Sequence, residues 1–314
     1  MAVLLVGGGG LIGTSLVRRL CGHGEELVVY SGHIPGSEPP CAWYQGDVTD
    51  MDRMAQVFGK HRIDCVIHNA GVSSPKLYPD DLYRIYRTNV TGVLNSLETA
   101  RRHHVSRFIY ISSAGVYAPG CPTDVREEDA RKGSLPYRAS KICGEELVRN
   151  YGMESVSLRV SYVYGPGRYI SCPIREMAEE LYKTGAVNRE TGRDQQQDFI
   201  YVEDVSEGIE QVLYTPVWPH TEYNLASGVL TGFDRILEIF WKRYPGCPIS
   251  MGAGKLGFTE NSLNISRFRE DFGWEPRVGL EKGMEQYLDW LERDLAYTGE
   301  SRRFHHVVSG LVKP

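Results

Sequence analysis

The sequence has 314 residues, of which 41% are hydrophobic and 24% are charged, and its formal net charge is −5. This composition is typical of a globular protein with one large or two smaller domains, and the acidic balance gives no reason to expect a nucleic-acid partner. No apolar run is long enough to span a membrane.

The seven cysteines are an odd number, are widely spread and form no Cys-x-x-Cys pair, so we expect reduced thiols and no metal site. The apolar N-terminus lacks a basic segment and meets glycines at once, which argues against a signal peptide. The expected location is therefore the cytoplasm.

A short apolar run, Ala2–Val6, opens the chain and predicts a buried strand. Four consecutive glycines follow it directly and lead into a helical pattern that continues to Leu20. Glycines let a backbone approach a pyrophosphate, and a helix N-terminus supplies amide groups and a positive dipole end. A flexible loop is the other interpretation, but the position directly after the first strand favours a dinucleotide site. The expected cofactor-binding residues of this turn are Gly7, Gly10, Leu11, Ile12 and Gly13.

The run Leu27–Tyr30 predicts a second strand, and its end is where a carboxylate would bind the hydroxyls of the adenosine ribose. Ser31, Gly32 and His33 stand there instead, and none of them is an acid. A missing carboxylate removes the repulsion of a 2′-phosphate, and Ser31 can donate a hydrogen bond. Since no arginine stands at this strand end, we expect relaxed selectivity, with NADP accepted beside NAD.

A third short strand, Ala42–Gln45, is followed by Gly46, Asp47 and Val48. Asp47 is expected either to accept a hydrogen bond from the adenine or to cap the helix that begins near Met51, and the sequence does not decide between the two. We include Asp47 and Val48 among the expected cofactor contacts.

Cys65–His68 predicts a fourth strand, which ends at the small-residue turn Asn69-Ala70-Gly71. Such a turn lets a cofactor lie over the strand end, whereas His68 is expected to be packed rather than catalytic. The segment Leu82–Arg102 predicts one long helix. Asn89 lies in its middle, where an asparagine is locally unfavourable, so we expect a tertiary role for this residue.

The fifth strand, Phe108–Ile111, delivers Ser112 and Ser113 to its carboxyl end, where ligands of open parallel sheets bind. Successive strand residues face opposite sides, so only one of the two serines reaches the site, and the pattern alone leaves both possible. Tyr137 and Lys141 are four residues apart, so a helix through both puts them on one face.

These side chains suit proton transfer at a carbon-bound hydroxyl or a carbonyl. A free tyrosine with a pKa near ~10 is a poor base at neutral pH, and a nearby ammonium group lowers that pKa because it favours the phenolate. A serine hydroxyl at the same reacting oxygen can donate a hydrogen bond. The competing interpretation is a surface helix with an exposed tyrosine and a solvated lysine, and the dinucleotide site argues against it.

The run Ser155–Val160 predicts a sixth strand, and a break at residues 163–167 begins the second half of the chain. Six alternating strands and helices imply an α/β fold with a doubly wound parallel sheet of the Rossmann type. We expect a dinucleotide-binding domain over residues 1–164 and a smaller, mainly substrate-binding lobe over residues 165–314, with some of its segments returning to the first domain. The elements expected in this second half are a helix over Ile174–Thr184, a polar stretch over 188–197, a helix ending at Tyr214, a strand over Glu222–Leu225, and helices near Gly232–Tyr244 and Leu280–Leu295.

Seven ordered segments resemble the extended short-chain dehydrogenases/reductases, and in particular their NAD(P)-dependent sugar epimerase/dehydratase group. They are the turn at 7–13, the triplet at 46–48, the stretch at 110–117, the pair Tyr137 and Lys141, the break at 163–167, the stretch at 198–205 and Gly273-Trp274-Glu275-Pro276. The resemblance covers nearly the whole chain.

The resemblance implies a role for each matching residue. Tyr137 would be the acid/base, Lys141 would bind the nicotinamide ribose and depress the pKa of the phenol, and Ser113 would bond the reacting oxygen. The residues that would hold the cofactor are Asp47, Asn69, Ala70, Gly71 and Asn89. A homodimer through the helices at Leu82–Arg102 and Tyr137–Tyr151 is implied by the resemblance alone.

Departures from the family pattern narrow the reaction. Family members that remove water carry an Asp-Glu pair directly after the catalytic hydroxyl residue, whereas this chain has Ala114 and Gly115, which cannot move a proton. The first interpretation is an epimerase that acts on a nucleotide-linked sugar through a transient keto intermediate, with bound NAD or NADP. The alternatives are an NAD(P)H-dependent keto-sugar reductase or dehydrogenase and a non-catalytic cofactor-binding regulatory protein. The intact set of Ser113, Tyr137 and Lys141 argues against the last.

The substrate pocket differs most from the family pattern. Tyr162 and Gln197 stand where family members commonly place an asparagine and an arginine against the substrate diphosphate, and Lys255 replaces a second family arginine. A neutral hydrogen bond to phosphate is about half as strong as a charged one. We expect an anionic substrate in an altered pose, held by Lys255 and one of four arginines that are individually expected to be solvated. These are Arg168, Arg175, Arg189 and Arg193.

Overall fold

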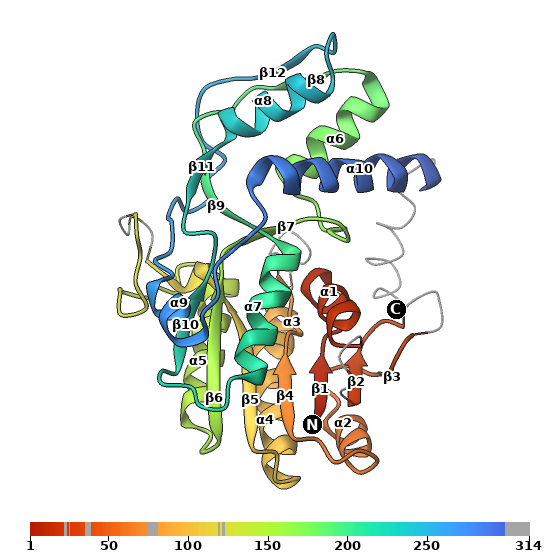
Figure 1. Cartoon of the computed structure of the whole chain (residues 1–314), viewed down its shortest axis with the longest axis vertical. Helices are drawn as coiled ribbons and strands as arrows, with labels where there is room; N and C mark the ends of the chain where they lie inside the picture. Colours follow the sequence, from red (N-terminus) through yellow and green to blue (C-terminus); the bar gives the residue numbers. More distant parts are fainter. Residues whose placement is uncertain are drawn as a thin grey trace.

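The computed structural model describes residues 1–21, 24, 26–34, 39–73, 81–118, 120 and 123–298. Its centre is a seven-stranded sheet with the order β10-β6-β5-β4-β1-β2-β3, in which every neighbouring pair is parallel (Figure 1). This confirms the doubly wound Rossmann-type sheet expected from the sequence. The strand order reverses between β1 and β4, and ligands of such sheets bind outside the carboxyl ends of the strands at that point.

The strands of this sheet are β1 (Ala2–Val6), β2 (Glu26–Ser31), β3 (Ala42–Gln45), β4 (Cys65–His68), β5 (Arg107–Ser113), β6 (Glu154–Val160) and β10 (Glu222–Leu225). The helices of the first lobe are α1 (Leu11–Leu20), α2 (Met51–Phe58), α3 (Leu82–Tyr86), α4 (Gly92–Arg102), α5 (Pro136–Asn150), α7 (Val202–Tyr214) and α9 (Ser266–Phe272).

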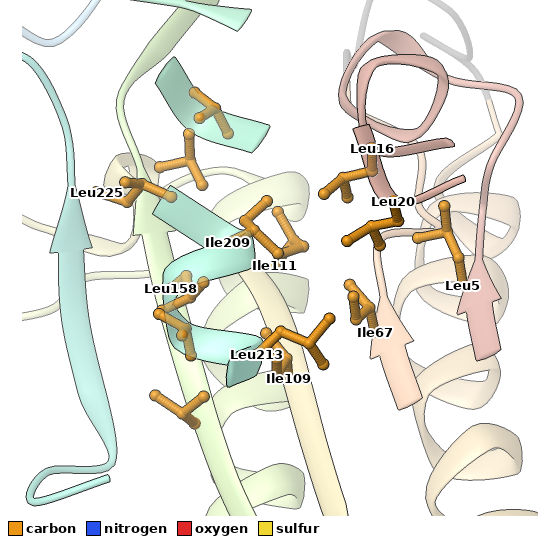
Figure 2. Close-up of a cluster of buried hydrophobic side chains, with 14 of the residues drawn as sticks. Leu5, Leu16, Leu20, Ile67, Ile109, Ile111, Leu158, Ile209, Leu213 and Leu225 are labelled. Carbon is orange, nitrogen blue, oxygen red and sulfur yellow. The ribbon is translucent and has the colours of Figure 1, made fainter. Parts of the chain in front are cut away.

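The side chains of β1 alternate between two hydrophobic layers, one on each face of the sheet. Val3 and Leu5 join the layer formed with α1 and α7, part of which is drawn in Figure 2. Leu4 and Val6 join the layer formed with α2 and α4 on the opposite face. A strand buried on both faces needs apolar residues at every position, which explains the unbroken apolar run at the start of the chain.

The second lobe has a core of its own. It combines a three-stranded sheet of order β11-β9-β7, the pair β12-β8 and three helices (Figure 1). Its elements are β7 (Tyr162–Tyr164), α6 (Pro173–Thr184), β8 (Val187–Arg189), β9 (Gln196–Tyr201), β11 (Leu230–Gly232), α8 (Phe233–Arg243), β12 (Ile249–Met251) and α10 (Leu280–Thr298). The polar stretch at 188–197 therefore contains the end of β8 and the start of β9.

Three elements from the second half of the chain complete the first lobe. β10 pairs with β6 and becomes the seventh strand of the sheet. Ile209 and Leu213 of α7 and Phe268 of α9 lie in the same hydrophobic layer as Leu5. The chain therefore crosses between the lobes several times.

The expected single helix at 82–102 is wrong in one respect. It consists of α3, a π-helical turn at Arg87–Thr91, and α4. The π-turn contains Asn89, whose side chain makes three tertiary hydrogen bonds. A wider turn at a residue held from outside the helix is a recurrent feature of functional sites. In the part of the chain that is described, no helix is both long and apolar enough to cross a membrane.

Candidate active site

The turn between β1 and α1 lies against the turn that follows β4. Gly7 has a φ of +93°, and a Cβ at this residue would lie 2.6 Å from the backbone nitrogen of Ala70. A Cβ at Gly13 would lie 2.3 Å from the carbonyl oxygen of Gly7, which also accepts a 2.9 Å hydrogen bond from the side-chain amide of Asn69. Only glycine fits at both positions, so the two expected cofactor turns meet where the strand order reverses.

The start of α1 suits an anionic group. Gly10 is its N-cap residue and Leu11 and Ile12 begin its first turn, which contains no acidic residue. The first N–H groups of a helix lack intrahelical partners, and the helix dipole favours negative charge there. Together with the close glycine packing, these residues fit the pyrophosphate of a dinucleotide.

The end of β2 carries no carboxylate, and its serine is turned inward. The Ser31 hydroxyl oxygen accepts hydrogen bonds from the backbone N–H groups of Gly9 at 3.2 Å and His33 at 3.4 Å. Ser31 is buried. By accepting these two hydrogen bonds it stabilises the glycine turn, and its own hydroxyl proton remains available for donation. Beside it, the space around the Cβ position of Gly32 is open.

Asp47 does not cap α2. Its carboxylate accepts hydrogen bonds from the backbone N–H and the hydroxyl of Thr49, at 2.8 and 2.9 Å. Asp50 is the N-cap residue and accepts a 2.9 Å bond from the Arg53 backbone N–H. The cap interpretation of Asp47 is therefore wrong, and its adenine contact stays a prediction. Val48 is buried in the hydrophobic layer beside α2 and α4.

Asn89 ties the turn after β4 to α5. Its carbonyl oxygen accepts a 2.7 Å bond from the Val72 backbone N–H, and its amide donates to the Val72 carbonyl at 3.1 Å and to the Ser140 hydroxyl at 2.9 Å. A Cβ at Gly71 would lie 3.1 Å from the Asn89 side-chain oxygen and 3.7 Å from Nζ of Lys141. In this arrangement Asn89 positions the Gly71 turn beside Lys141.

The structure brings Ser113 and Tyr137 together. Ser113 ends β5 and Tyr137 lies in the first turn of α5, and their side chains share a hydrogen bond. Burial raises the pKa of Tyr137, and the bond to Ser113 acts in the opposite direction. Ser112 faces the other way and donates a 2.6 Å bond to Glu145. Of the two candidate serines, Ser113 is thus the one beside the tyrosine.

Lys141 lies beneath the site with its ammonium group bound to the backbone. Nζ donates a 2.7 Å hydrogen bond to the Ile111 carbonyl and lies 4.8 Å from the ring centroid of Tyr110. Burial lowers the pKa of Lys141 to about 8. The phenol pKa of Tyr137 is raised rather than depressed, because burial outweighs the stabilisation of the phenolate in this arrangement. The expected effect of Lys141 on that pKa is therefore not seen here.

A buried charged cluster that the sequence reasoning missed supports the site from below. Glu145 is fully buried and accepts hydrogen bonds from Arg159 at 3.0 and 2.9 Å and from Arg131 at 3.0 Å, besides that from Ser112. Glu145 follows Lys141 by four residues, so it lies on the same face of α5. That spacing is the signal by which it could have been found.

The three expected substrate residues do not converge on one point. Tyr162 packs edge to face against Phe258, with ring centroids 6.3 Å apart, and the buried Gln197 donates a 3.3 Å bond to the Thr259 carbonyl. Both therefore contact the segment that follows β12. Lys255 is exposed and forms an ion pair with Glu260 instead.

The four arginines of the second lobe differ in their surroundings. Arg175 is buried and pairs with carboxylates of α6 and α10, so the expectation of a solvated side chain is wrong for it. Arg189 pairs with two carboxylates of α6, and Arg193 is exposed. Arg168 is partly buried, with its guanidinium carbon 4.8 Å from the ring centroid of Tyr162.

The guanidinium of Arg168 has spare hydrogen-bond donors. One nitrogen donates a 2.6 Å bond to the Val163 carbonyl. Within the described residues no carboxylate pairs with Arg168, and its buried Nε has no hydrogen-bond partner. A Cβ at the preceding Gly167 would lie 3.8 Å from Leu11, so this arginine stands between the cofactor turn and the second lobe.

No set of His, Cys, Asp and Glu side chains in the described segments is arranged to hold a metal ion. Six of the seven cysteines are free thiols, and Cys121 lies outside the described residues. A pocket of about 90 Å³ in the second lobe is lined by residues of α6, by Arg189, and by Met251 and Phe258.

Comparison with known proteins agrees with this geometry. A UDP-glucose 4-epimerase from Streptococcus mutans is 31% identical over 324 residues, which cover 92% of this chain and 96% of that protein. A dTDP-glucose 4,6-dehydratase from Neisseria meningitidis is 26% identical over 337 residues, covering 92% of each chain. The structure of a UDP-glucose 4-epimerase from Thermotoga maritima with UDP-glucose superposes with a TM-score of 0.84 at 24% identity, covering 94% of this chain and 100% of that one.

Residues 3–226 match the sequence profile described as the NAD dependent epimerase/dehydratase family. This range holds most of the chain, from the glycine turn to the end of β10, and includes Ser113, Tyr137 and Lys141. The protein is therefore a member of the NAD-dependent epimerase/dehydratase family.

Proposed function

We propose that this enzyme epimerises a nucleotide-linked sugar at a hydroxyl-bearing carbon, through a transient keto sugar. The observation that carries the proposal is the partly buried pair of Ser113 and Tyr137 beside the cofactor turns, with no second acid or base at Ala114 or Gly115. Relatives named as UDP-glucose 4-epimerases and a structural neighbour that holds UDP-glucose support the substrate class.

Tyr137 takes the proton of the sugar hydroxyl in its phenolate form, which the positive charge of an oxidised nicotinamide beside it would favour against the burial that raises its pKa. Ser113 donates a hydrogen bond that fixes the same oxygen. A bound nicotinamide dinucleotide supplies the hydride acceptor and, on the way back, the hydride donor. When the keto sugar presents its opposite face, Tyr137 returns the proton to the oxygen and the configuration is inverted. No side chain is present at Gly115 to draw a proton from a neighbouring carbon, so loss of water does not compete.

Arg168 is the cation that we assign to the substrate diphosphate. It has no carboxylate partner among the described residues and lies against Tyr162, one of the expected substrate positions. Lys255, by contrast, is exposed and already paired with Glu260. A charged hydrogen bond from a guanidinium is roughly twice as strong as one from the neutral Tyr162 or Gln197.

A homodimer through α3, α4 and α5 is part of the proposal. The first two of these helices expose four large hydrophobic residues, Leu82, Tyr83, Tyr86 and Leu94, of which Tyr83 is 75% exposed. Burying such a surface would favour association. Light scattering of Tyr83→Glu should give a monomer if this surface forms the interface, and a wild-type monomer would contradict it.

The decisive experiment is an incubation of the purified protein with sub-stoichiometric NAD and each of a panel of UDP-, dTDP-, GDP- and CDP-sugars. An epimerase interconverts two sugars without a net change in absorbance at 340 nm, and nuclear magnetic resonance identifies the pair. A stoichiometric change in that absorbance would favour the reductase or dehydrogenase. An absence of any turnover or binding across the panel would contradict the nucleotide-sugar proposal.

A further inference from the structure

Arg138 follows Tyr137 directly and lies beside the reacting pair. A methyl group on Gly115 would lie 3.6 Å from Cγ of Arg138, 3.8 Å from the Tyr137 ring and 3.3 Å from the Ser113 hydroxyl oxygen. The stem of Arg138 therefore borders the same small space as the two groups that hold the sugar hydroxyl. Because Gly115 has no side chain, this residue places no atom of its own in that space.

The guanidinium of Arg138 has only neutral partners. It donates to the hydroxyl of Ser134 at 3.5 Å and to the hydroxyl of Thr259. No carboxylate in the described ranges pairs with it. Two other arginines near α5 differ: Arg131 pairs with Glu145, and Arg149 pairs with Glu146 and Glu222.

The surroundings of Arg138 make this lack of a counter-charge significant. The side chain is partly buried, and burial lowers its pKa. Removing a cation from water without an opposite charge costs free energy. A hydroxyl partner recovers only part of that cost, whereas a carboxylate in bidentate contact recovers more. An anionic ligand that displaced the Thr259 hydroxyl would therefore be held tightly.

Thr259 places this guanidinium beside one of the expected substrate positions. The Thr259 carbonyl accepts a 3.3 Å bond from Gln197, one of the expected substrate positions. Arg138 thus spans from the catalytic helix α5 to the segment beside Gln197. The diphosphate has its own cation in Arg168, which stands at Tyr162 rather than at the Ser113 and Tyr137 pair.

We propose that Arg138 binds a carboxylate on the sugar ring itself, close to the reacting carbon, and that the substrate is a nucleotide-linked uronic acid. This inference rests on the proposed function, because it names the sugar that the same site accepts. Arg138 is then the residue that selects an acidic sugar over a neutral one.

The test compares three probes that differ in their anionic groups: UDP, UDP-glucose and UDP-glucuronate. Each is titrated calorimetrically into the NAD-loaded wild-type enzyme, Arg138→Gln and Arg138→Lys. We expect the wild type to bind UDP-glucuronate at least tenfold more tightly than UDP-glucose, which corresponds to about 1.4 kcal/mol. Arg138→Gln should abolish this preference and leave the affinities for UDP and UDP-glucose within about threefold of the wild type.

Arg138→Lys should keep part of the preference, because it keeps the charge but loses the planar fork. Arg149→Gln is the matched control, because it removes an arginine of the same helix that is already paired with carboxylates and should leave the preference intact. Thermal unfolding of each variant establishes that it is folded.

Two results would overturn the inference and leave the proposed function standing. One is a wild type that binds both sugars equally well. The other is an Arg138→Gln variant that loses affinity equally for all three probes, which would make Arg138 a diphosphate ligand or a structural link to Thr259. If UDP and both sugars fail to bind the wild type, the same comparison is made with the nucleotide that binds in the wider panel; if no nucleotide sugar of that panel binds, the proposed function itself is contradicted, and this inference falls with it.

Discussion

Ser112 and Ser113 are consecutive residues of β5 whose hydroxyls serve opposite faces of the sheet end. Ser113 bonds Tyr137, whereas Ser112 donates a 2.6 Å bond to the buried carboxylate of Glu145. Because successive side chains of β5 point to opposite sides, this one strand contacts both the reacting Tyr137 and the buried charged cluster around Glu145. Glu145 and Tyr137 lie on the same helix, so β5 and α5 are joined on both sides of that strand end.

Tyr137→Phe removes only the phenol oxygen. Because general acid–base catalysis contributes about 10²–10⁴-fold, kcat should fall by at least that factor while the fold and NAD binding are retained. Steady-state kinetics and NAD titration measure the two effects. Tyr110→Phe is the control, since its buried hydroxyl has no hydrogen-bond partner in the described structure. Near-normal turnover of Tyr137→Phe would refute the assignment.

Glu145→Ala should destabilise the fold by about 3–5 kcal/mol, because it leaves the buried guanidinium of Arg159 without its carboxylate partner. Urea denaturation measures the free energy of unfolding. A second substitution, Arg159→Met in the Glu145→Ala background, removes the unpaired guanidinium and should recover part of the lost free energy of unfolding. If Glu145→Ala costs less than about 1 kcal/mol, the cluster does not support the site as described.

Stability should depend on pH through Lys141, whose pKa burial lowers from 10.5 to about 8. Between these values the folded protein binds fewer protons than the unfolded chain, so stability rises with pH across this window. Below about pH 8 Lys141 is protonated in both the folded and the unfolded state, so the full free-energy cost of burying its charge applies. Lys141→Met lacks that cost, so its advantage over the wild type in free energy of unfolding should shrink as the pH rises from about 7 to 10. A constant or growing difference would contradict the prediction.

Cofactor selectivity should respond to a single residue at the end of β2. The wild type is expected to accept NADP, and more than about 100-fold preference for NAD, or 2.7 kcal/mol, would be incompatible with this view. Gly32→Asp places a carboxylate in open space at that strand end and should select NAD by repelling the 2′-phosphate. Gly32→Asn is the uncharged control, and fluorescence titration of both cofactors gives the ratio.

Arg168→Met should raise KM for the nucleotide sugar by at least tenfold, since a charged hydrogen bond to phosphate is worth about 1.5–3 kcal/mol. Lys255→Ala should have a much smaller effect, because exposed ion pairs contribute little and Lys255 is already engaged by Glu260. The comparison of the two KM values at low salt decides which cation holds the diphosphate. A larger effect at Lys255 would restore the assignment made from the sequence.

Local patterns were sufficient to predict the strands and turns of the first lobe. The apolar run Ala2–Val6 and the glycines that follow it define their own conformation, because strand burial and close packing leave few alternatives. The helix at 82–102 was predicted without its π-turn, because the bonds from Asn89 to Val72 and Ser140 are tertiary. Helical periodicity carries no information about such partners.

The charged residues were the least predictable part of the site. The sequence places Arg175 in a predicted helix, four residues before Glu179, but it does not show that Arg175 is buried between carboxylates of two helices while Arg168 stacks on Tyr162 without one. The surroundings of the two arginines differ because α10 packs beside Arg175, whereas Arg168 lies over the ring of Tyr162 in β7. For the same reason the sequence did not single out Arg138, because one of its two neutral partners, Thr259, lies 121 residues further along the chain.

The return of β10 to the edge of the large sheet bears on how such proteins can diversify. An exchange of everything after residue 164 would therefore also replace β10, one of the two neighbours of β6, and α7, which packs in the apolar layer of the first lobe. Changes confined to the stretches between these elements, such as 165–195 and 226–265, leave the large sheet and its apolar layer intact.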